Sequence, residues 1–192
     1  LSFGGNPQLT TSAIYNGSSW TTNPGLNVGR HSAAGFGIST AGVAVGGDQI
    51  PSTRQITSTE SFDGSTWTEE TANPTATSCA GGFGTNAAGA VVGGFTPPSF
   101  ALTGVTNEYA AGTWTAGGAI SPSLVCMGSI GTQTAGMVIS GYNGPDENTS
   151  RVTTVSDYNG TAWTASPVSI TQARNGMGSV GTQALALVYG GR

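Results

Sequence analysis

Hydrophobic residues recur at a fixed interval along this chain, in short runs that glycine and small polar residues separate. Apolar triplets stand at residues 43–45, 90–92, 137–139 and 187–189, and each is followed by two small residues, usually Gly-Gly. The blocks around these triplets begin at residues 33, 80, 127 and 177, so the intervals are 47, 47 and 50 residues. Unbroken apolar runs of this length are typical of strands that are covered on both faces.

An aromatic residue followed by tryptophan repeats with the same interval. The segments are YNGSSW (15–20), FDGSTW (62–67), YAAGTW (109–114) and YNGTAW (158–163), and their tryptophans are 47, 47 and 49 residues apart. Two independent marks with one period indicate tandem repeat units. We expect the aromatic residue and the tryptophan to pack between neighbouring units.

Each unit contains four short strand candidates, which in the best-defined copy cover about 33–38, 42–47, 56–62 and 65–70. Asn16-Gly17, Asp63-Gly64 and Asn159-Gly160 predict two-residue hairpin turns between the third and fourth strands, because type I′ turns need positive φ. Ala111-Gly112 is a weaker form of the same signal. No stretch has a 3.6-residue apolar period, so we expect essentially no helix.

Four antiparallel strands in about 50 residues are the blade of a β-propeller. The sequence therefore predicts an all-β chain, a single β-propeller domain over 1–192 with about four repeats of 47–50 residues. Residues 1–5 repeat the strand that 187–191 supply, so the chain either closes four blades or is a segment of a larger propeller. The predicted units are approximately 1–30, 31–77, 78–124, 125–174 and a partial unit, 175–192.

The Gly-Gly pairs, followed by Tyr or Phe and then Trp, resemble kelch repeats. The strings GTQTAG (131–136), YNGTAW and VYGG (188–191) are similar to kelch-like arrays of bacteriophage and marine-virus structural proteins. The chain departs from ordinary kelch in the short gap before Trp and in Ser140, which replaces the first glycine of one pair. The resemblance implies a non-enzymatic module of a virion surface, such as a tail fibre, attachment or decoration protein. Its implied partners are other virion subunits or copies of itself.

Charge narrows the range of partners. The chain has five Arg and no Lys against nine carboxylates, for a net charge of −4, and no basic run. Nucleic acid is therefore not an expected partner, because its binding depends on cationic contacts to phosphate. No apolar run is long enough to span a membrane, so membrane insertion is not expected.

Cys79 and Cys126 lie one period apart, and the sequence favours two small buried thiols while leaving a bridge between them open.

Sequence variation is concentrated between the second and third strands of each unit, at 48–55, 95–103 and 142–151. In a four-stranded meander these segments share one end with the connections between units, 21–31 and 167–175. Variation on one face of a repeat scaffold is typical of binding, here of a host-surface glycan. The candidate residues are polar or aromatic side chains of these segments: Arg30, His31, Asp48, Arg54, Phe100, Tyr142, Asp146, Glu147, Arg151 and Arg174.

Catalytic and metal-binding patterns are weak. His31 is the single histidine, so it cannot form a two-histidine metal site, and Asp146-Glu147-Asn148 lacks the alternating spacing of a calcium loop. We therefore predict no metal, no cofactor and no catalytic residue. The alternative is a sialidase-like or other glycoside-acting enzyme, because SFDGSTW (61–67) resembles the Asp-box turn of sialidase propellers. Against it, glycoside hydrolysis normally needs two positioned carboxylates, and the five arginines are scattered.

Overall fold

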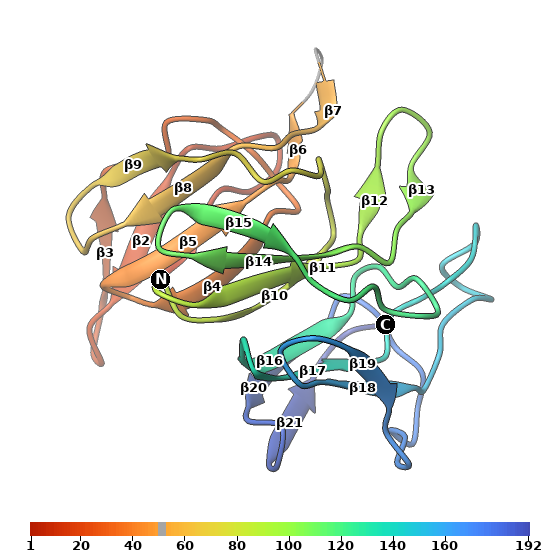
Figure 1. Ribbon diagram of the computed structural model, residues 1–192. Coiled ribbons are helices and arrows are strands. Elements are labelled where there is room, and N and C mark those ends of the chain that lie inside the picture. Colours follow the sequence, from red (N-terminus) through yellow and green to blue (C-terminus); the bar gives the residue numbers. More distant parts are fainter. Residues whose placement is uncertain (50–52) are drawn as a thin grey trace.

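The computed structural model describes residues 1–49 and 53–192, which form only strands, turns and loops (Figure 1). The prediction of an all-β chain is therefore confirmed. Within these residues there is no helix, and hence none long and apolar enough to cross a membrane.

Three of the sheets are complete four-stranded antiparallel meanders, and in each the strand order follows the chain. Sheet 2 contains β4 (Ala34–Ile38), β5 (Ala41–Val45), β8 (Thr59–Phe62) and β9 (Trp67–Glu70). Sheet 3 contains β10 (Gly81–Gly84), β11 (Gly89–Val92), β14 (Thr106–Ala110) and β15 (Thr113–Ala116). Sheet 4 contains β16 (Gly128–Thr132), β17 (Ala135–Ile139), β18 (Val155–Tyr158) and β19 (Trp163–Ala165).

Two smaller sheets lie at the ends of the chain, and two short hairpins extend from complete sheets. Sheet 1 has three strands, β1 (Ser2–Phe3), β2 (Ser12–Tyr15) and β3 (Trp20–Asn23), and sheet 5 has two, β20 (Gly178–Gly181) and β21 (Ala186–Tyr189). One hairpin pairs β6 (Asp48–Gln49) with β7 (Thr53–Gln55), and the other pairs β12 (Phe95–Thr96) with β13 (Ala101–Leu102).

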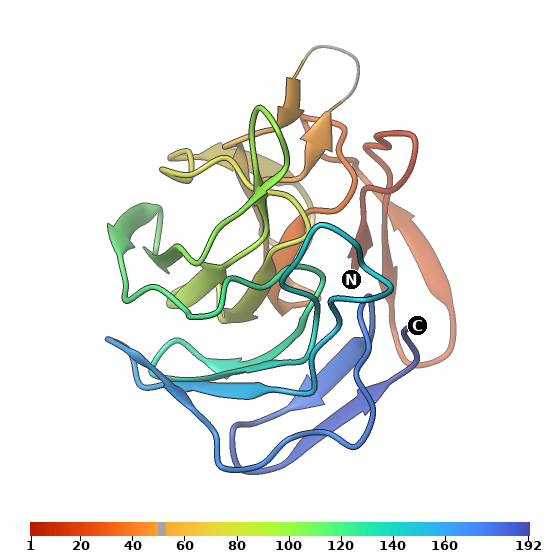
Figure 2. The same ribbon diagram turned by 90° about the vertical axis from the view of Figure 1, so that its right-hand side faces the viewer.

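The sheets follow one another around a common centre, as Figure 2 shows. Contacts between the first strands, β4 with β10, β10 with β16 and β16 with β20, join successive sheets. In the described residues β21 pairs only with β20, so the strands of sheets 5 and 1 do not join into a closed ring.

Two ladders of backbone hydrogen bonds connect successive units. In the glycine ladder the amides of Gly5, Gly47, Gly94 and Gly141 donate to the carbonyls of Arg30, Thr77, Leu124 and Arg174 at 2.8–3.0 Å. The residues of the second ladder have positive φ, so we call it the left-handed ladder. In it the amides of Cys79, Cys126 and Gly176 donate to the carbonyls of Ser32, Cys79 and Cys126 at 2.8–2.9 Å. These contacts make the repeat a structural one, because equivalent residues occupy equivalent places in each unit.

The cores lie between neighbouring sheets, and the second strands of sheets 2 to 4 are buried as their apolar sequence predicts. The prediction is wrong for 187–189, because β21 is largely exposed. Val43, Val45, Val92 and Val138 have no exposed surface. The aromatic side chains fit against glycine: a Cβ at Gly89 would collide with the ring of Phe36, and one at Gly136 with the ring of Phe83. In the next copy Ile130 replaces the phenylalanine and Ala186 replaces the glycine.

Three of the four tryptophans reach the preceding unit, as predicted. The indole nitrogen of Trp67 donates to Ser12 Oγ at 3.3 Å, that of Trp114 to the Thr71 carbonyl at 2.9 Å, and that of Trp163 to Thr106 Oγ1 at 2.8 Å. The prediction is wrong for Trp20. It belongs to the first sheet and is 61% exposed, because the described residues place no sheet before it.

The predicted two-residue hairpin turns are also wrong at three sites. The register pairs Tyr15 with Trp20, Phe62 with Trp67 and Tyr158 with Trp163, so four residues connect each pair of strands. The cause is local. The side-chain oxygen of Asn16, Asp63 or Asn159 accepts the two following turn amides at 2.7–3.0 Å, which replaces a tighter backbone turn.

The weaker turn signal marks the true two-residue turn. Ala110 pairs with Thr113 in the register of β14 and β15. Both residues between them have positive φ, 44° for Ala111 and 92° for Gly112, as a type I′ turn requires.

Candidate functional site

The variable segments lie at one end of the molecule, which we call the loop end. The hairpins β6–β7 and β12–β13 and the segment 142–151 all leave between the second and third strands of sheets 2, 3 and 4. Figure 1 shows both hairpins standing out from this end, and Figure 2 looks onto it. The short hairpin connections within the sheets form the opposite end, the turn end.

The same pair of backbone hydrogen bonds recurs in four units at the loop end, and the residue that forms it differs from unit to unit. The residue after each small-residue pair forms two backbone hydrogen bonds with a residue of the connection that enters the same sheet. The distances are 2.8 and 3.2 Å for Asp48 with His31, and 2.8 and 3.1 Å for Phe95 with Ser78. We call the four residues in this place the rim positions: Asp48, Phe95, Tyr142 and Arg192.

Asp48, His31 and Gln55 form a polar cluster at the first rim position. Gln55 Nε2 donates to Asp48 Oδ1 at 2.9 Å, and His31 Nδ1 lies 3.7 Å from Asp48 Oδ2. Asp48 is nearly buried, whereas the His31 side chain keeps 20% of its surface exposed. The structure therefore brings these two predicted residues together.

An aromatic row crosses from sheet 3 to sheet 4. The ring of Phe95 makes edge-on contacts with Phe100, with centroids 5.5 Å apart, and with Tyr142, at 6.0 Å. Phe95 and Phe100 are partly exposed, while Tyr142 is buried, and this burial raises the pKa of its phenol. Tyr142 also forms an antiparallel bridge with Arg151, another predicted residue.

The remaining predicted residues of the segment 142–151 make local contacts. Glu147 forms an ion pair with Arg192, with 2.8 Å between Oε1 and the guanidinium. Asp146 accepts the Asn148 amide at 2.9 Å and so caps its own loop, and Arg151 donates weakly to the Asn148 carbonyl at 3.4 Å. Asp146 is exposed and Glu147 is half-buried.

The other three predicted arginines are Arg30, Arg174 and Arg54. Arg30 is fully buried and forms an ion pair with Glu60, so it is a structural residue and not part of the surface. Arg174 is half-buried and donates to the Gly190 carbonyl at 2.8 Å. Arg54 belongs to β7, and its side chain lies outside the described residues.

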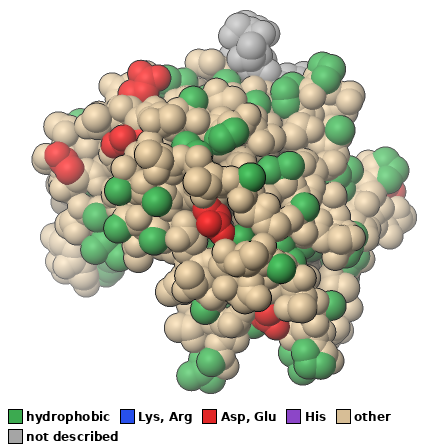
Figure 3. Space-filling model, in the orientation of Figure 1, with side chains coloured by type: hydrophobic (Ala, Val, Ile, Leu, Met, Phe, Trp, Pro, Cys, Tyr) green, Lys and Arg blue, Asp and Glu red, His purple; other side chains and the backbone are tan. Residues whose placement is uncertain are grey.

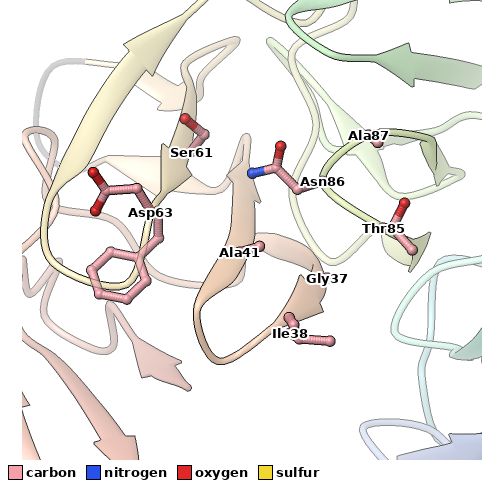
Figure 4. A pocket seen from close by; sticks show the side chains of 9 residues that line it. Gly37, Ile38, Ala41, Ser61, Asp63, Thr85, Asn86 and Ala87 are labelled. Carbon is pink, nitrogen blue, oxygen red and sulfur yellow. The ribbon is translucent and has the colours of Figure 1, made fainter.

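A separate pocket of about 580 Å³ lies at the turn end between sheets 2 and 3 (Figure 4). Gly37, Ala41 and Asp63 line it on one side and the turn 85–87 on the other. Equivalent residues line a smaller pocket of about 370 Å³ between sheets 4 and 5. Repetition at equivalent places shows that this pocket arises where neighbouring sheets meet.

On the face of the molecule in Figure 3, charged side chains do not form a continuous patch. Figure 3 shows acidic side chains scattered singly over one face of the molecule. Across the described residues, no three His, Cys, Asp or Glu side chains lie close enough together to hold a metal ion. Known protein families and curated proteins provide no match to this chain.

Sequence reasoning missed Phe95, Gln55, Asn175 and Arg192 as candidates. The signal for two of them was present: Phe95 and Arg192 directly follow a Gly-Gly pair, as Asp48 does. Gln55 and Asn175 carry no such mark, because their roles come from contacts to Asp48 and Glu147 that only the folded chain makes.

Proposed function

We propose that this protein is a non-enzymatic binding module of β-propeller type, belongs to a viral surface structure, and recognises a host-surface glycan through its loop end. The propeller arrangement is supported by the two ladders and by the succession of sheets around one centre in Figure 2. The viral context is supported by the resemblance of the repeat to kelch-like arrays of virion proteins. Other virion subunits or copies of the chain are its proposed structural partners.

The rim positions carry the binding part of the proposal. Four successive units hold an acid, two aromatic residues and an arginine in one backbone frame, whereas the second strands of the same units keep apolar residues at equivalent places. A scaffold that keeps its packing and varies its loops is typical of recognition.

The chemistry of these side chains suits a sugar. Partly exposed aromatic rings, Phe95 and Phe100, offer apolar faces to the C–H surface of a pyranose. Carboxylates and guanidinium groups nearby, Asp146, Glu147 and Arg192, accept and donate hydrogen bonds to hydroxyl groups. An uncharged glycan also fits a chain whose net charge is −4 and whose sequence has no basic run.

A glycan array with matched variants tests this proposal. We expect wild type to bind a restricted set of glycans, and Phe100→Ala and Arg151→Ala to lose about tenfold or more in affinity, as central contacts do. Tyr15→Ala is the control, because it removes an exposed aromatic ring at the turn end. A blank array with folded wild type, or equal loss in the control, would contradict glycan recognition by the loop end.

No specific observation favours the glycoside-acting alternative. Asp48 and Glu147, two carboxylates at the loop end, each have a protein partner. Asp48 accepts a hydrogen bond from Gln55, and Glu147 forms an ion pair with Arg192. Release of product from fluorogenic glycosides, lost in Asp48→Asn or Glu147→Gln, would replace the binding proposal with that alternative.

A further inference from the structure

Cys79 and Cys126 occupy the same position in the connections that enter sheets 3 and 4. Both belong to the left-handed ladder, with φ of 53° and 51°, and the Cys126 amide donates to the Cys79 carbonyl at 2.8 Å. Ser32 and Gly176 hold the equivalent positions before and after them, with φ of 54° and 62°. The backbone therefore fixes the two cysteines side by side by the same contact that joins the other units.

The two thiols lie close enough to interact with each other. Each belongs to a free cysteine residue of intermediate exposure. Ser32 contacts the Cys79 thiol, and Tyr142 contacts the Cys126 thiol. These are the two cysteines of the whole sequence, so any reaction between thiols of one chain is theirs.

We infer that Cys79 and Cys126 form a dithiol site that reacts with small external disulfides, of the glutathione disulfide class, and closes to a disulfide between sheets 3 and 4. A disulfide needs close Cα atoms and side chains that point together. The direct backbone hydrogen bond and the contact between the thiols meet both requirements. The inference does not rest on the proposed glycan recognition, although Tyr142, a rim position, contacts the Cys126 thiol.

The environment assigns the two cysteines different roles. The hydrogen bond from Cys126 lowers the pKa of Cys79, and the same interaction, together with burial, raises the pKa of Cys126. The thiolate is the reactive species in exchange, so Cys79 is the attacking residue. Cys126, whose amide donates to the Cys79 carbonyl and so holds its side chain beside Cys79, is the resolving thiol.

The reaction balances in two exchanges. The Cys79 thiolate attacks one sulfur of the external disulfide, which forms a mixed disulfide and releases one thiolate. Cys126 then loses its proton to solvent and attacks Cys79 Sγ, which forms the intersheet bond and releases the second thiolate. Two protein thiols are oxidised, and one external disulfide is reduced to two thiols.

Thiol counting and mass spectrometry on the reduced chain test the site. With glutathione disulfide, we expect wild type to lose both free thiols and two hydrogen atoms without gaining glutathione. Cys126→Ser should instead retain one glutathionyl group on Cys79, and Cys79→Ser should react at least about tenfold more slowly. Two free thiols that persist in folded wild type, or equal rates in the two single variants, would overturn the inference.

The repeat itself supplies matched controls. Ser32→Cys combined with Cys126→Ser moves the pair one unit towards the N-terminus, where the Cys79 amide donates to the Ser32 carbonyl at 2.9 Å. We expect this variant to close a disulfide as wild type does. Ser129→Cys combined with Cys126→Ser places a thiol in sheet 4 but outside the ladder, and should not bridge to Cys79. Bridging in both variants, or in neither, would contradict the assigned geometry.

Closure should also be visible in stability. A disulfide between residues 79 and 126 closes a loop in the unfolded chain and so lowers the entropy of the unfolded state. Tm should therefore rise on the order of 10 °C on oxidation. Both single serine variants should show no such rise with the same treatment, and a wild-type Tm that falls on closure would show that the geometry does not fit a disulfide.

Discussion

Arg30 and Glu60 form a fully buried ion pair between the connection into sheet 2 and its third strand. All five guanidinium donors of Arg30 are used, because it also donates to the carbonyls of Val28, Gly46 and Ser58 and to Ser58 Oγ. Glu60 further accepts the amides of Asn27 and Val28 at 2.6 and 3.1 Å. Burial lowers the pKa of Arg30, and Glu60 opposes that shift.

Removing the carboxylate charge should be costly. Glu60→Gln leaves the guanidinium buried beside a neutral group, and such broken pairs lose about 3–5 kcal/mol of stability. Glu108→Gln is the control, because Glu108 lies in the third strand of sheet 3, at the position equivalent to Ser61, and accepts the Tyr158 hydroxyl at 2.5 Å instead of a guanidinium. Urea unfolding should show a loss at Glu60 and less than about 1 kcal/mol at Glu108. Equal small losses would contradict the structural role of the pair.

Asp63 should make stability depend on acid pH. Hydrogen bonds from the Thr66 and Ser65 amides lower the pKa of Asp63 from 3.8 to about 2. A lowered folded pKa adds stability above the unfolded pKa, which is lost as pH falls through the folded value. Asp63→Asn keeps the turn, as Asn16 and Asn159 do in their copies, but removes the titration. Between about pH 4 and pH 2 the Tm of wild type should therefore fall more than that of the variant, and parallel curves would argue against it.

At the scale of elements, a side-chain clamp joins the first hairpins of sheets 3, 4 and 5 to the sheet before each of them. Gln133 Nε2 donates to the carbonyls of Gly89 and Tyr109 at 2.9 and 3.0 Å, and Gln183 makes the equivalent pair of bonds. Asn86 is one methylene shorter and makes a single long contact, 3.5 Å to the Gly42 carbonyl. Figure 4 shows Asn86 at the wall of the turn-end pocket, where the shorter side chain leaves space.

Exchanging the two clamp residues should shift stability in opposite directions. Asn86→Gln should reach the Phe62 carbonyl as well and gain about 1 kcal/mol, whereas Gln133→Asn should lose about the same amount. Urea unfolding of both variants checks this. A loss in Asn86→Gln, or no change in Gln133→Asn, would show that the clamp does not couple the sheets.

Elements were predictable where one physical effect dominated. The apolar second strands and three of the interlocking tryptophans follow from burial, which repeats with the sequence. The turns at Asn16, Asp63 and Asn159 did not follow, because side-chain oxygens compete for amides that the backbone turn would use. At the site, the grouping of loops at one end followed from strand order. The burial of Arg30 did not, since its partner Glu60 is 30 residues away in the sequence.

At the scale of the whole molecule, the end sheets differ from the others. Leu187 and Tyr189 of sheet 5 are 60% and 54% exposed, although their counterparts in sheets 2 to 4 are buried. Trp20 of sheet 1 is exposed for the same reason, because each face is covered elsewhere by a neighbouring sheet. Successive sheets therefore pack through the same kind of interface. Among the described residues, the outer faces of sheets 1 and 5 lack such a neighbour, so their apolar side chains are exposed.

The measurement that tests the account most directly is a pair of distances between spin labels. Labels at Ser18 and Ser65, equivalent turns of sheets 1 and 2, are each paired with one at Ala184 of sheet 5. Sheets arranged around a centre predict that the Ser18–Ala184 distance is no longer than the Ser65–Ala184 distance. A straight stack would make it longer by about one sheet spacing, roughly 10 Å. That result would contradict the radial arrangement on which the loop end depends.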